Sequence, residues 1–237
     1  MKTSYIVFAL LFTASAKLFA QEEVIDLSFP LTTEQKVDLN LRFADKIEVK
    51  PWNKKELFVR ASIIINDGLM NEAHKIDTII DNHAIEISTG FDEEVIRGNK
   101  YINCNGKNRS QHNFSGRRGD DRNYSICHTI HYTVFLPAEA ELKLETISGD
   151  ILIENMTGKV DARSISGHVD LVIAKNHKAD IQLESVTGRA YTDPPMFTTR
   201  DGLQSLLSRK VNGQLNGGGK KLHLESVSGN VRLRYPN

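Results

Sequence analysis

The sequence lacks an excess of charge of either sign, because 30 Lys and Arg residues balance 30 Asp and Glu residues over 237 positions. Nucleic-acid-binding domains carry clustered, uncompensated Lys and Arg, so this balance argues against a nucleic-acid partner. The first 20 residues hold Lys2 and Lys17 and no acid, and without them 28 bases face 30 acids, a net charge of −2. The charge balance selects no partner.

Familiar catalytic signatures are also missing. The chain has no Ser/His/Asp order, no dinucleotide-binding fingerprint and no phosphate-binding loop, since Gly217-Gly218-Gly219 is not followed by Lys and Ser or Thr. The sequence therefore predicts no catalytic residues and no cofactor.

Long apolar runs are scarce, and the one at residues 6–16 is about half the ~20 residues that a membrane-spanning helix needs. It follows the basic start Met1-Lys2 and leads into small residues, which is the pattern of a secretory signal peptide. We expect cleavage after Ala20, giving a mature chain that begins at Gln21; cleavage after Ala16 and an uncleaved anchor are the alternatives. No cysteine lies near this point, which excludes an acylated lipoprotein start. The chain is expected to be periplasmic, on the outer surface or secreted, with no transmembrane helix after cleavage.

Cysteine is scarce as well, with only Cys104 and Cys127. An oxidising compartment favours a disulfide between them, worth about 3 kcal/mol by loop-closure entropy. Two unpaired cysteines in adjacent strands are the alternative.

Alternation of apolar and polar residues dominates the rest of the chain. Apolar residues at every second position predict half-buried strands at residues 37–43, 47–49, 57–65, 84–87 and 130–136. Only residues 68–79 and 203–210 have a helical pattern, and both are short. The sequence predicts an all-β protein with one or two helical turns in insertions.

A five-residue motif recurs in the second half. Residues 145–149, 163–167, 184–188 and 225–229 each read Glu or Arg, Ser or Thr, Ile or Val, Ser or Thr, and Gly. The final glycines, Gly149, Gly167, Gly188 and Gly229, are 18, 21 and 41 residues apart, and a weaker copy ends at Gly158. We expect these glycines to form corners with positive φ, where a Cβ would clash, and the Ser and Thr residues to bond to the local backbone.

A repeat of about 18–21 residues with two short strands and a glycine corner predicts a parallel β-solenoid, in which each coil buries its apolar face against its neighbours. A β-sandwich with Ser-Gly hairpin turns is the alternative. We expect one domain over residues 21–237, with the repeats densest at 132–235. The expected inward ladder is Leu142, Leu144, Ile151, Ile153, Val160, Val169, Leu171, Ile181, Leu183, Leu222, Leu224, Val231 and Leu233.

The run His131-Tyr132-Thr133-Val134-Phe135-Leu136-Pro137, the Ile-Ser-Gly-Asp-Ile core at residues 147–151 and the closing segment 215–234 resemble the bacterial putative-adhesin family, which is related to head GIN domains. The resemblance implies an exported β-solenoid of unknown function and brings no catalytic residues. It covers roughly residues 37–235, and this chain departs from the compact pattern at insertions 105–126 and 192–220.

The first insertion is polar, carries a net charge of +3 and predicts an exposed loop suited to binding. Its candidate interaction residues are Arg117, Arg118, Gly119, Asp120 and Arg122. Arg118-Gly119-Asp120 matches the tripeptide of integrin ligands, although such a tripeptide also arises by chance in a loop of this composition.

Cys127, His128 and His131 invite a metal-binding interpretation. In a strand, His128 and His131 point to opposite faces, while Cys127 and His131 share a face about 13 Å apart at ~3.3 Å per residue. One ion cannot bind both, so we expect no metal site.

The sequence thus favours an exported, non-enzymatic, adhesin-like protein that binds a protein or glycan of the envelope or cell surface. A periplasmic envelope-stress or scaffold component is one alternative. A polysaccharide-active β-helix is another, with Asp150, Asp161, Asp170 and Arg163 as its candidate residues. Asp161 and Asp170 follow corners nine residues apart, which fits either stacking on one face or simple solvation of the outer face of a coil.

Overall fold

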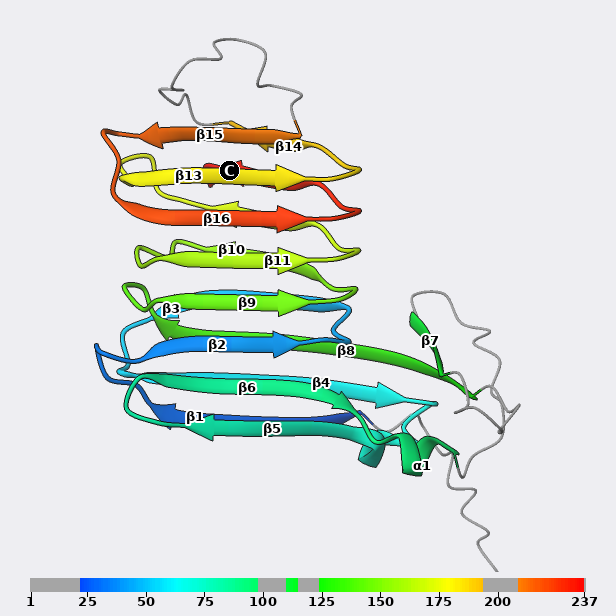
Figure 1. The fold of residues 1–237 in the computed structure, drawn as a ribbon. Helices are drawn as coiled ribbons and strands as arrows, with labels where there is room; N and C mark the ends of the chain where they lie inside the picture. The colour runs from blue at the N-terminus through cyan, green and yellow to red at the C-terminus, as the bar shows by residue number, and fades with distance from the viewer. Residues whose placement is uncertain (1–21, 98–109, 115–123, 194–208, 237) are drawn as a thin grey trace, which may run out of the picture.

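The computed structural model describes residues 22–97, 110–114, 124–193 and 209–236. These residues form a mostly β structure of two mixed, largely parallel sheets, with one short helix (Figure 1). The expected signal peptide at residues 1–20 lies outside the described residues. Within the described part of the chain, no helix is both long enough and apolar enough to span a membrane.

The strands divide between two sheets, which we call sheet A and sheet B. Sheet A has the order β1 (Glu23–Pro30), β4 (Glu56–Ile65), β8 (Tyr124–Pro137), β3 (Lys46–Trp52), β10 (Asp150–Glu154), β12 (Val169–Val172), β17 (Val231–Arg234) and β14 (Ala190–Thr192), and β7 (Ser110–Phe114) pairs with β8. Sheet B has the order β15 (Lys210–Leu215), β13 (Ala179–Ser185), β16 (Lys220–Ser226), β11 (Val160–Ser164), β9 (Leu142–Thr146), β2 (Lys36–Leu41), β6 (Ala84–Phe91) and β5 (His74–Ile80). The described antiparallel pairs involve β1, β4, β5, β7 and β15, and the middle of each sheet is parallel.

The strands predicted from alternation are present as β2, β3, β4, β6 and β8. The helical prediction for residues 68–79 is wrong. Only Asn71–Ala73 forms a 3₁₀ turn, and His74–Ile80 is strand β5, paired antiparallel with β6. Of the second predicted helix, residues 203–208 lie outside the described part, and Lys210 begins β15. The short helix α1 at Glu93–Arg97 was not predicted.

From β9 to β14, and again from β16 to β17, successive strands alternate between the sheets, so that each Ser-Gly turn joins strands of opposite sheets and is not a hairpin turn. The exception is β15 and β16, which both belong to sheet B. Val160 on β11 lies beside Leu142 on β9, and Val169 on β12 lies beside Ile151 on β10, each 18 residues further along the chain. Every residue of the expected inward ladder is buried between the sheets. Their side chains form one continuous hydrophobic core with the residues of β2, β3, β4 and β8.

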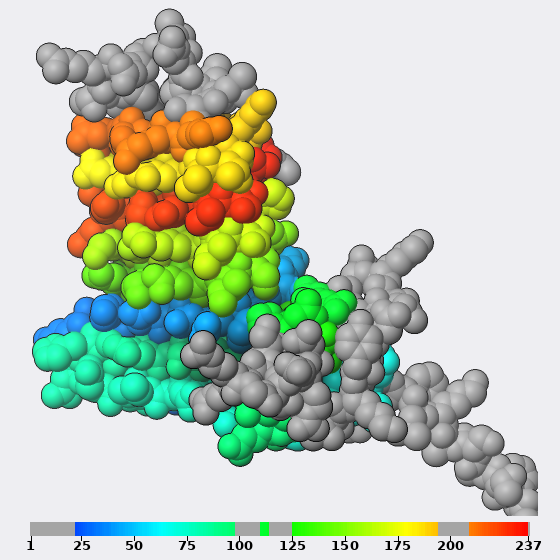
Figure 2. Space-filling model, turned by 45° about the vertical axis from the view of Figure 1, so that its right-hand side comes forward, coloured from blue at the N-terminus to red at the C-terminus, as the bar shows by residue number. Residues whose placement is uncertain are grey.

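The spatial order of the strand pairs differs from their order in the sequence. The C-terminal pair, β16 and β17, lies between the pair β11–β12 and the pair β13–β14. In Figure 2 the red C-terminal layer accordingly lies between yellow-green and yellow layers. This insertion explains the 41-residue gap before the last motif. The chain first forms β15, which pairs antiparallel with one edge of β13, and then returns to form β16 on the other edge of β13.

The motif glycines lie in the connections between strands, but the expectation of positive φ at these corners is wrong. Among the described glycines only Gly68, Gly217 and Gly218 have positive φ. The motif glycines are needed for close approach instead: a Cβ at Gly167 would lie 1.9 Å from the carbonyl oxygen of Gly149. The glycine turns stack in contact with one another, and a side chain would separate them.

A hydroxyl three residues before each stacked glycine completes the turn. Ser226 is fully buried, and its Oγ donates to the carbonyl of Gly167 at 2.8 Å and accepts from the backbone N–H of Gly229 at 2.8 Å. Ser164 repeats this arrangement one layer away, with Gly149 as its acceptor. These hydroxyls bond to the backbone as the sequence predicted, and they also link one layer to the next.

Candidate functional site

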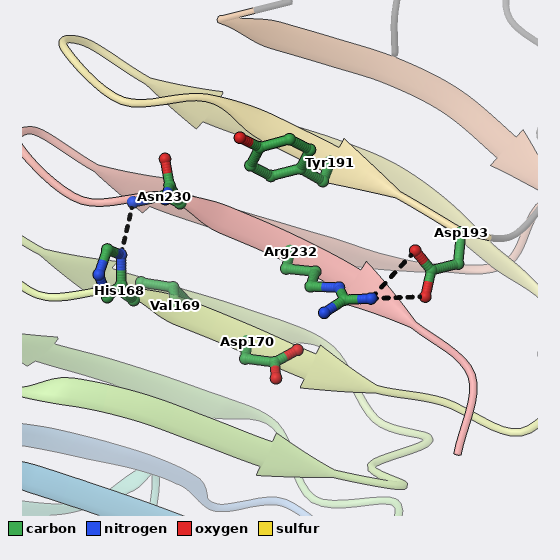
Figure 3. Close-up of a pocket in the computed structure, with 7 residues that line it drawn as sticks. All are labelled: His168, Val169, Asp170, Tyr191, Asp193, Asn230 and Arg232. Carbon is green, nitrogen blue, oxygen red and sulfur yellow. Dashed lines mark hydrogen bonds and ion pairs between the residues drawn. The ribbon is translucent and has the colours of Figure 1, made fainter. Parts of the chain in front are cut away.

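A groove of about 460 Å³ crosses the outer face of sheet A over β12, β17 and β14. Alternation produces it, because Val169, Leu171, Val231 and Leu233 are buried and the polar residues between them face outward. Asp170, Arg232 and Tyr191 occupy one register position on the three neighbouring strands. The lining residues are His168, Val169, Asp170, Tyr191, Asp193, Asn230 and Arg232 (Figure 3).

Backbone hydrogen bonds orient the two polar side chains at one end of the groove. The N–H of Asn230 donates to Nδ1 of His168 at 2.8 Å, and the N–H of Arg189 donates to Oδ1 of Asn230 at 3.0 Å. A backbone N–H can only donate, so the imidazole atom that accepts carries no proton. With Nδ1 as an acceptor, the ring hydrogen of His168 is on Nε2, and the NH₂ group of Asn230 is the end of the amide that is left for a ligand.

Two arginine–carboxylate pairs occupy the other end. Nη2 of Arg232 lies 3.1 Å from the Asp193 carboxylate, and Nε of Arg234 lies 2.8 Å from the Asp170 carboxylate. The Arg232–Asp193 pair is about half exposed, and such pairs contribute roughly 0–1 kcal/mol to stability. The main effect of the two pairs is to balance charge locally and to hold the guanidinium of Arg232 at the groove.

The four residues considered for polysaccharide cleavage do not form one site. Asp150 and Asp170 belong to sheet A, whereas Asp161 and Arg163 belong to sheet B. Of the two alternatives for Asp161 and Asp170, stacking is excluded, because a nine-residue step carries the chain from one sheet to the other. On sheet B, Asp161 accepts from Nδ1 of His223 at 3.0 Å and also lies near Arg163.

Cys127, His128 and His131 all lie on β8 but have different surroundings. His128 is buried with Nδ1 3.3 Å from the Asp45 carboxylate, while His131 is exposed. Cys127 is buried, and Cys104 lies outside the described residues, so the disulfide between them stays a prediction. In the described part of the chain, no three His, Cys, Asp or Glu residues are placed to hold a metal ion.

A half-buried histidine, His74 on β5, contacts strand β8. Nε2 of His74 is 2.7 Å from the hydroxyl of Tyr132, and its ring packs against Phe91. Burial and, to a smaller extent, the positive charge of a protonated His128 lower the pKa of His74 to about 4. Burial raises the pKa of Tyr132. The partly buried site of His74 therefore favours the neutral imidazole.

An aromatic cluster lies on sheet A, over β3, β4 and β8. The rings of Trp52 and Phe135 have centroids 5.4 Å apart, and Phe58 lies 5.8 Å from Trp52. Nζ of Lys54 lies 4.6 Å from the centroid of Trp52, and Arg60 lies over Phe58. Because these rings contact one another and are covered by cations, the cluster is a cross-strand packing unit.

The proposed interaction residues Arg117, Arg118, Gly119, Asp120 and Arg122 lie outside the described residues. The described parts of the insertion are strands, since β7 pairs antiparallel with the extended first half of β8. The expectation of a loop over the whole of residues 105–126 is therefore wrong for residues 110–114 and 124–126.

The groove residues Tyr191, Asn230, Arg232 and Asp193 were not predicted. A signal for three strands of the groove is present, because residues 170, 191 and 232 each lie three positions after a motif glycine. Using that signal requires the spatial order of the repeats, in which the last repeat lies between two earlier ones.

No protein-family model and no curated protein sequence matches the chain. A solved structure of a putative cell adhesion protein from Clostridium sporogenes ATCC 15579 matches with a TM-score of 0.50 and 13% identity, over 91% of this chain and 100% of that one. The chain shares the fold of this clostridial protein. A structure of a putative adhesin from Bacteroides fragilis NCTC 9343 matches with a TM-score of 0.32 and 11% identity, over 90% of this chain and 97% of that one. The expected resemblance is confirmed as a structural likeness.

Proposed function

We propose that this protein is an exported, non-enzymatic, adhesin-like binding protein that presents the outer face of sheet A to a macromolecule of the envelope or cell surface. The observation that carries the proposal is the groove over β12, β17 and β14, whose outward polar groups are held in place by backbone hydrogen bonds and ion pairs. The clostridial protein with the same fold is described as a putative cell adhesion protein.

The scaffold in this proposal is a β-solenoid. The 18-residue register between β9 and β11 and between β10 and β12, and the direct stacking of the glycine turns, support this interpretation. In such a scaffold each layer is fixed by its neighbours, so outward side chains keep constant spacing. Rigid spacing favours binding, because little side-chain entropy remains to be lost when a partner binds.

The arrangement of carboxylates favours binding over catalysis. Hydrolysis of a glycosidic bond needs two carboxyl groups with separate roles, one of which donates a proton. Both carboxylates of the groove, Asp170 and Asp193, accept hydrogen bonds from arginines, which leaves neither placed as a proton donor. Of the other candidates, Asp161 and Arg163 are on the opposite sheet, and Asp150 on sheet A accepts a hydrogen bond from the backbone N–H of His168.

Export and location can be tested with intact cells of the producing bacterium. Added protease should degrade a surface-bound protein while a cytoplasmic marker stays intact, and the culture medium should be assayed for released protein. Protection from protease until the outer membrane is opened would support the periplasmic scaffold and contradict surface binding.

Activity can be tested separately by incubating the purified protein with envelope and host polysaccharides. We expect no increase in reducing ends or in unsaturated products over the protein-free control. Turnover that is lost in Asp170→Asn would overturn the non-enzymatic proposal.

A further inference from the structure

The groove on sheet A has unengaged donors, whereas its carboxylates, Asp170 and Asp193, already accept from arginines. Within the described structure, its side-chain nitrogens without a protein partner are Nε2 of His168, Nδ2 of Asn230, and Nε and Nη1 of Arg232. All of these are donors, since the acceptor atoms of His168 and Asn230 are already used by backbone N–H groups. The unengaged side-chain nitrogens therefore select a ligand rich in acceptor oxygens.

The charge and shape of the groove restrict that ligand further. Arg232 faces Asp193, and Arg234 faces Asp170, so the paired charges nearly cancel and recognition depends on hydrogen bonds more than on net charge. Tyr191 supplies a half-buried aromatic ring beside Asn230 and Arg232 (Figure 3). A volume of about 460 Å³ lies within the range of small-ligand sites.

These features together match the chemistry of a sugar. A pyranose ring offers a C–H face that packs on an aromatic ring, and its hydroxyl, acetamido or carboxylate oxygens accept hydrogen bonds around its rim. We propose that this groove binds a saccharide whose carbonyl or carboxylate oxygens accept from His168, Asn230 and Arg232 while one sugar face packs on Tyr191. This inference rests on the proposed binding function and names the ligand class for it.

The direct test is a titration of the purified protein with three soluble tetrasaccharides, followed by calorimetry or NMR. The N-acetylglucosamine tetramer carries acetamido carbonyls, tetragalacturonate carries carboxylates, and maltotetraose carries hydroxyl groups without either. At least one of the first two should bind with a Kd below about 1 mM and about tenfold more tightly than maltotetraose. No binding of the first two, or equal binding of all three, would overturn the proposal.

An isosteric variant tests the predicted donors. Asn230→Asp keeps the Oδ1 acceptor for the N–H of Arg189 but replaces the NH₂ donor with an acceptor, so affinity for the binding tetrasaccharide should fall about tenfold or more. Asn212→Asp makes the same change on β15, where the residue is exposed on the other sheet. Equal affinity of the two variants would contradict the assignment.

A second pair of variants tests the ring and guards against misfolding. Tyr191→Phe keeps the aromatic face and should weaken binding less than Tyr191→Ala does. Equal losses in both variants, with unchanged circular dichroism, would show that the ring face is not used.

The outcome is distinguishable from failure of the proposed function. Attachment of the protein to cell surfaces without tetrasaccharide binding would overturn the saccharide inference and leave the adhesin-like function standing. Tetrasaccharide binding without attachment to any cell surface would support the groove and contradict the adhesin-like function.

Discussion

Replacing Gly167 by alanine should strongly destabilise the protein, although alanine is the smallest possible addition. The added Cβ would lie 1.9 Å from the carbonyl oxygen of Gly149 and 2.8 Å from Oγ of Ser164. The first neighbour is backbone and cannot rotate away, so the two turns must separate. The same carbonyl accepts the hydrogen bond from Ser164 at 3.0 Å, which separation would lengthen.

The magnitude follows from these two effects. Overpacking of a tight interior typically costs about 1–3 kcal/mol, and a weakened buried hydrogen bond costs about 0.5–1.5 kcal/mol. We therefore expect Gly167→Ala to lower the free energy of unfolding by about 1.5–4.5 kcal/mol.

Gly90→Ala is the matched control, since Gly90 on β6 does not have positive φ and a Cβ there would meet nothing within 4 Å. Surface changes of this kind usually alter stability by no more than about 0.5 kcal/mol. Urea denaturation followed by circular dichroism gives both values. Equal midpoints for the two variants would refute the argument that close approach of the turns explains the motif glycines.

Three further predictions follow from the described contacts and from the sequence. Ser226→Ala leaves the buried N–H of Gly229 unpaired and should lower the free energy of unfolding by about 1–3 kcal/mol in urea denaturation. A decrease no larger than that caused by Ser228→Ala, at an exposed serine, would contradict this. The pKa of His74 is about 4 when folded and 6.5 when unfolded, so the unfolded chain binds an extra proton between these values. Stability should therefore fall by up to about 3 kcal/mol as pH falls from 7 to 4, and His74→Gln should flatten this dependence; an unchanged slope would show that His74 is not responsible. The intact mass of exported protein should place Gln21 first and show two hydrogens fewer than the reduced form, and alkylation of Cys104 and Cys127 without reductant would exclude the bridge.

The strands and the core were readable from the sequence because burial in a sheet depends on a local period of two. Leu142, Val160 and Val169, for example, are buried at positions where polar residues flank them on both sides, as a half-buried strand requires. The same rule misleads where the pattern is short. Residues 74–80 contain apolar residues at spacings that fit a helix, and only pairing with β6 makes them a strand.

The stacking order and the groove could not be read in this way because they depend on contacts between distant segments. Nothing local to residues 220–234 shows that β16 and β17 lie between two earlier strand pairs. Without that order, Arg232 cannot be placed between Asp170 and Tyr191. The role of the motif glycines could not be predicted for the same reason. A Cβ there would clash with the backbone of the neighbouring turn, which is distant in the sequence, while the φ angle of the glycine itself is not positive.

The most direct test of the adhesin-like function is attachment of labelled, purified protein to intact bacterial and host cells. The comparison is between the wild type, Asn230→Asp on the outer face of sheet A and Asn212→Asp on sheet B, after confirming that all three unfold at the same temperature. The account predicts that the wild type and Asn212→Asp attach equally and that Asn230→Asp attaches about tenfold less. Attachment of none of the three proteins would contradict the adhesin-like function, and equal attachment of all three would contradict the outer face of sheet A as the attachment surface.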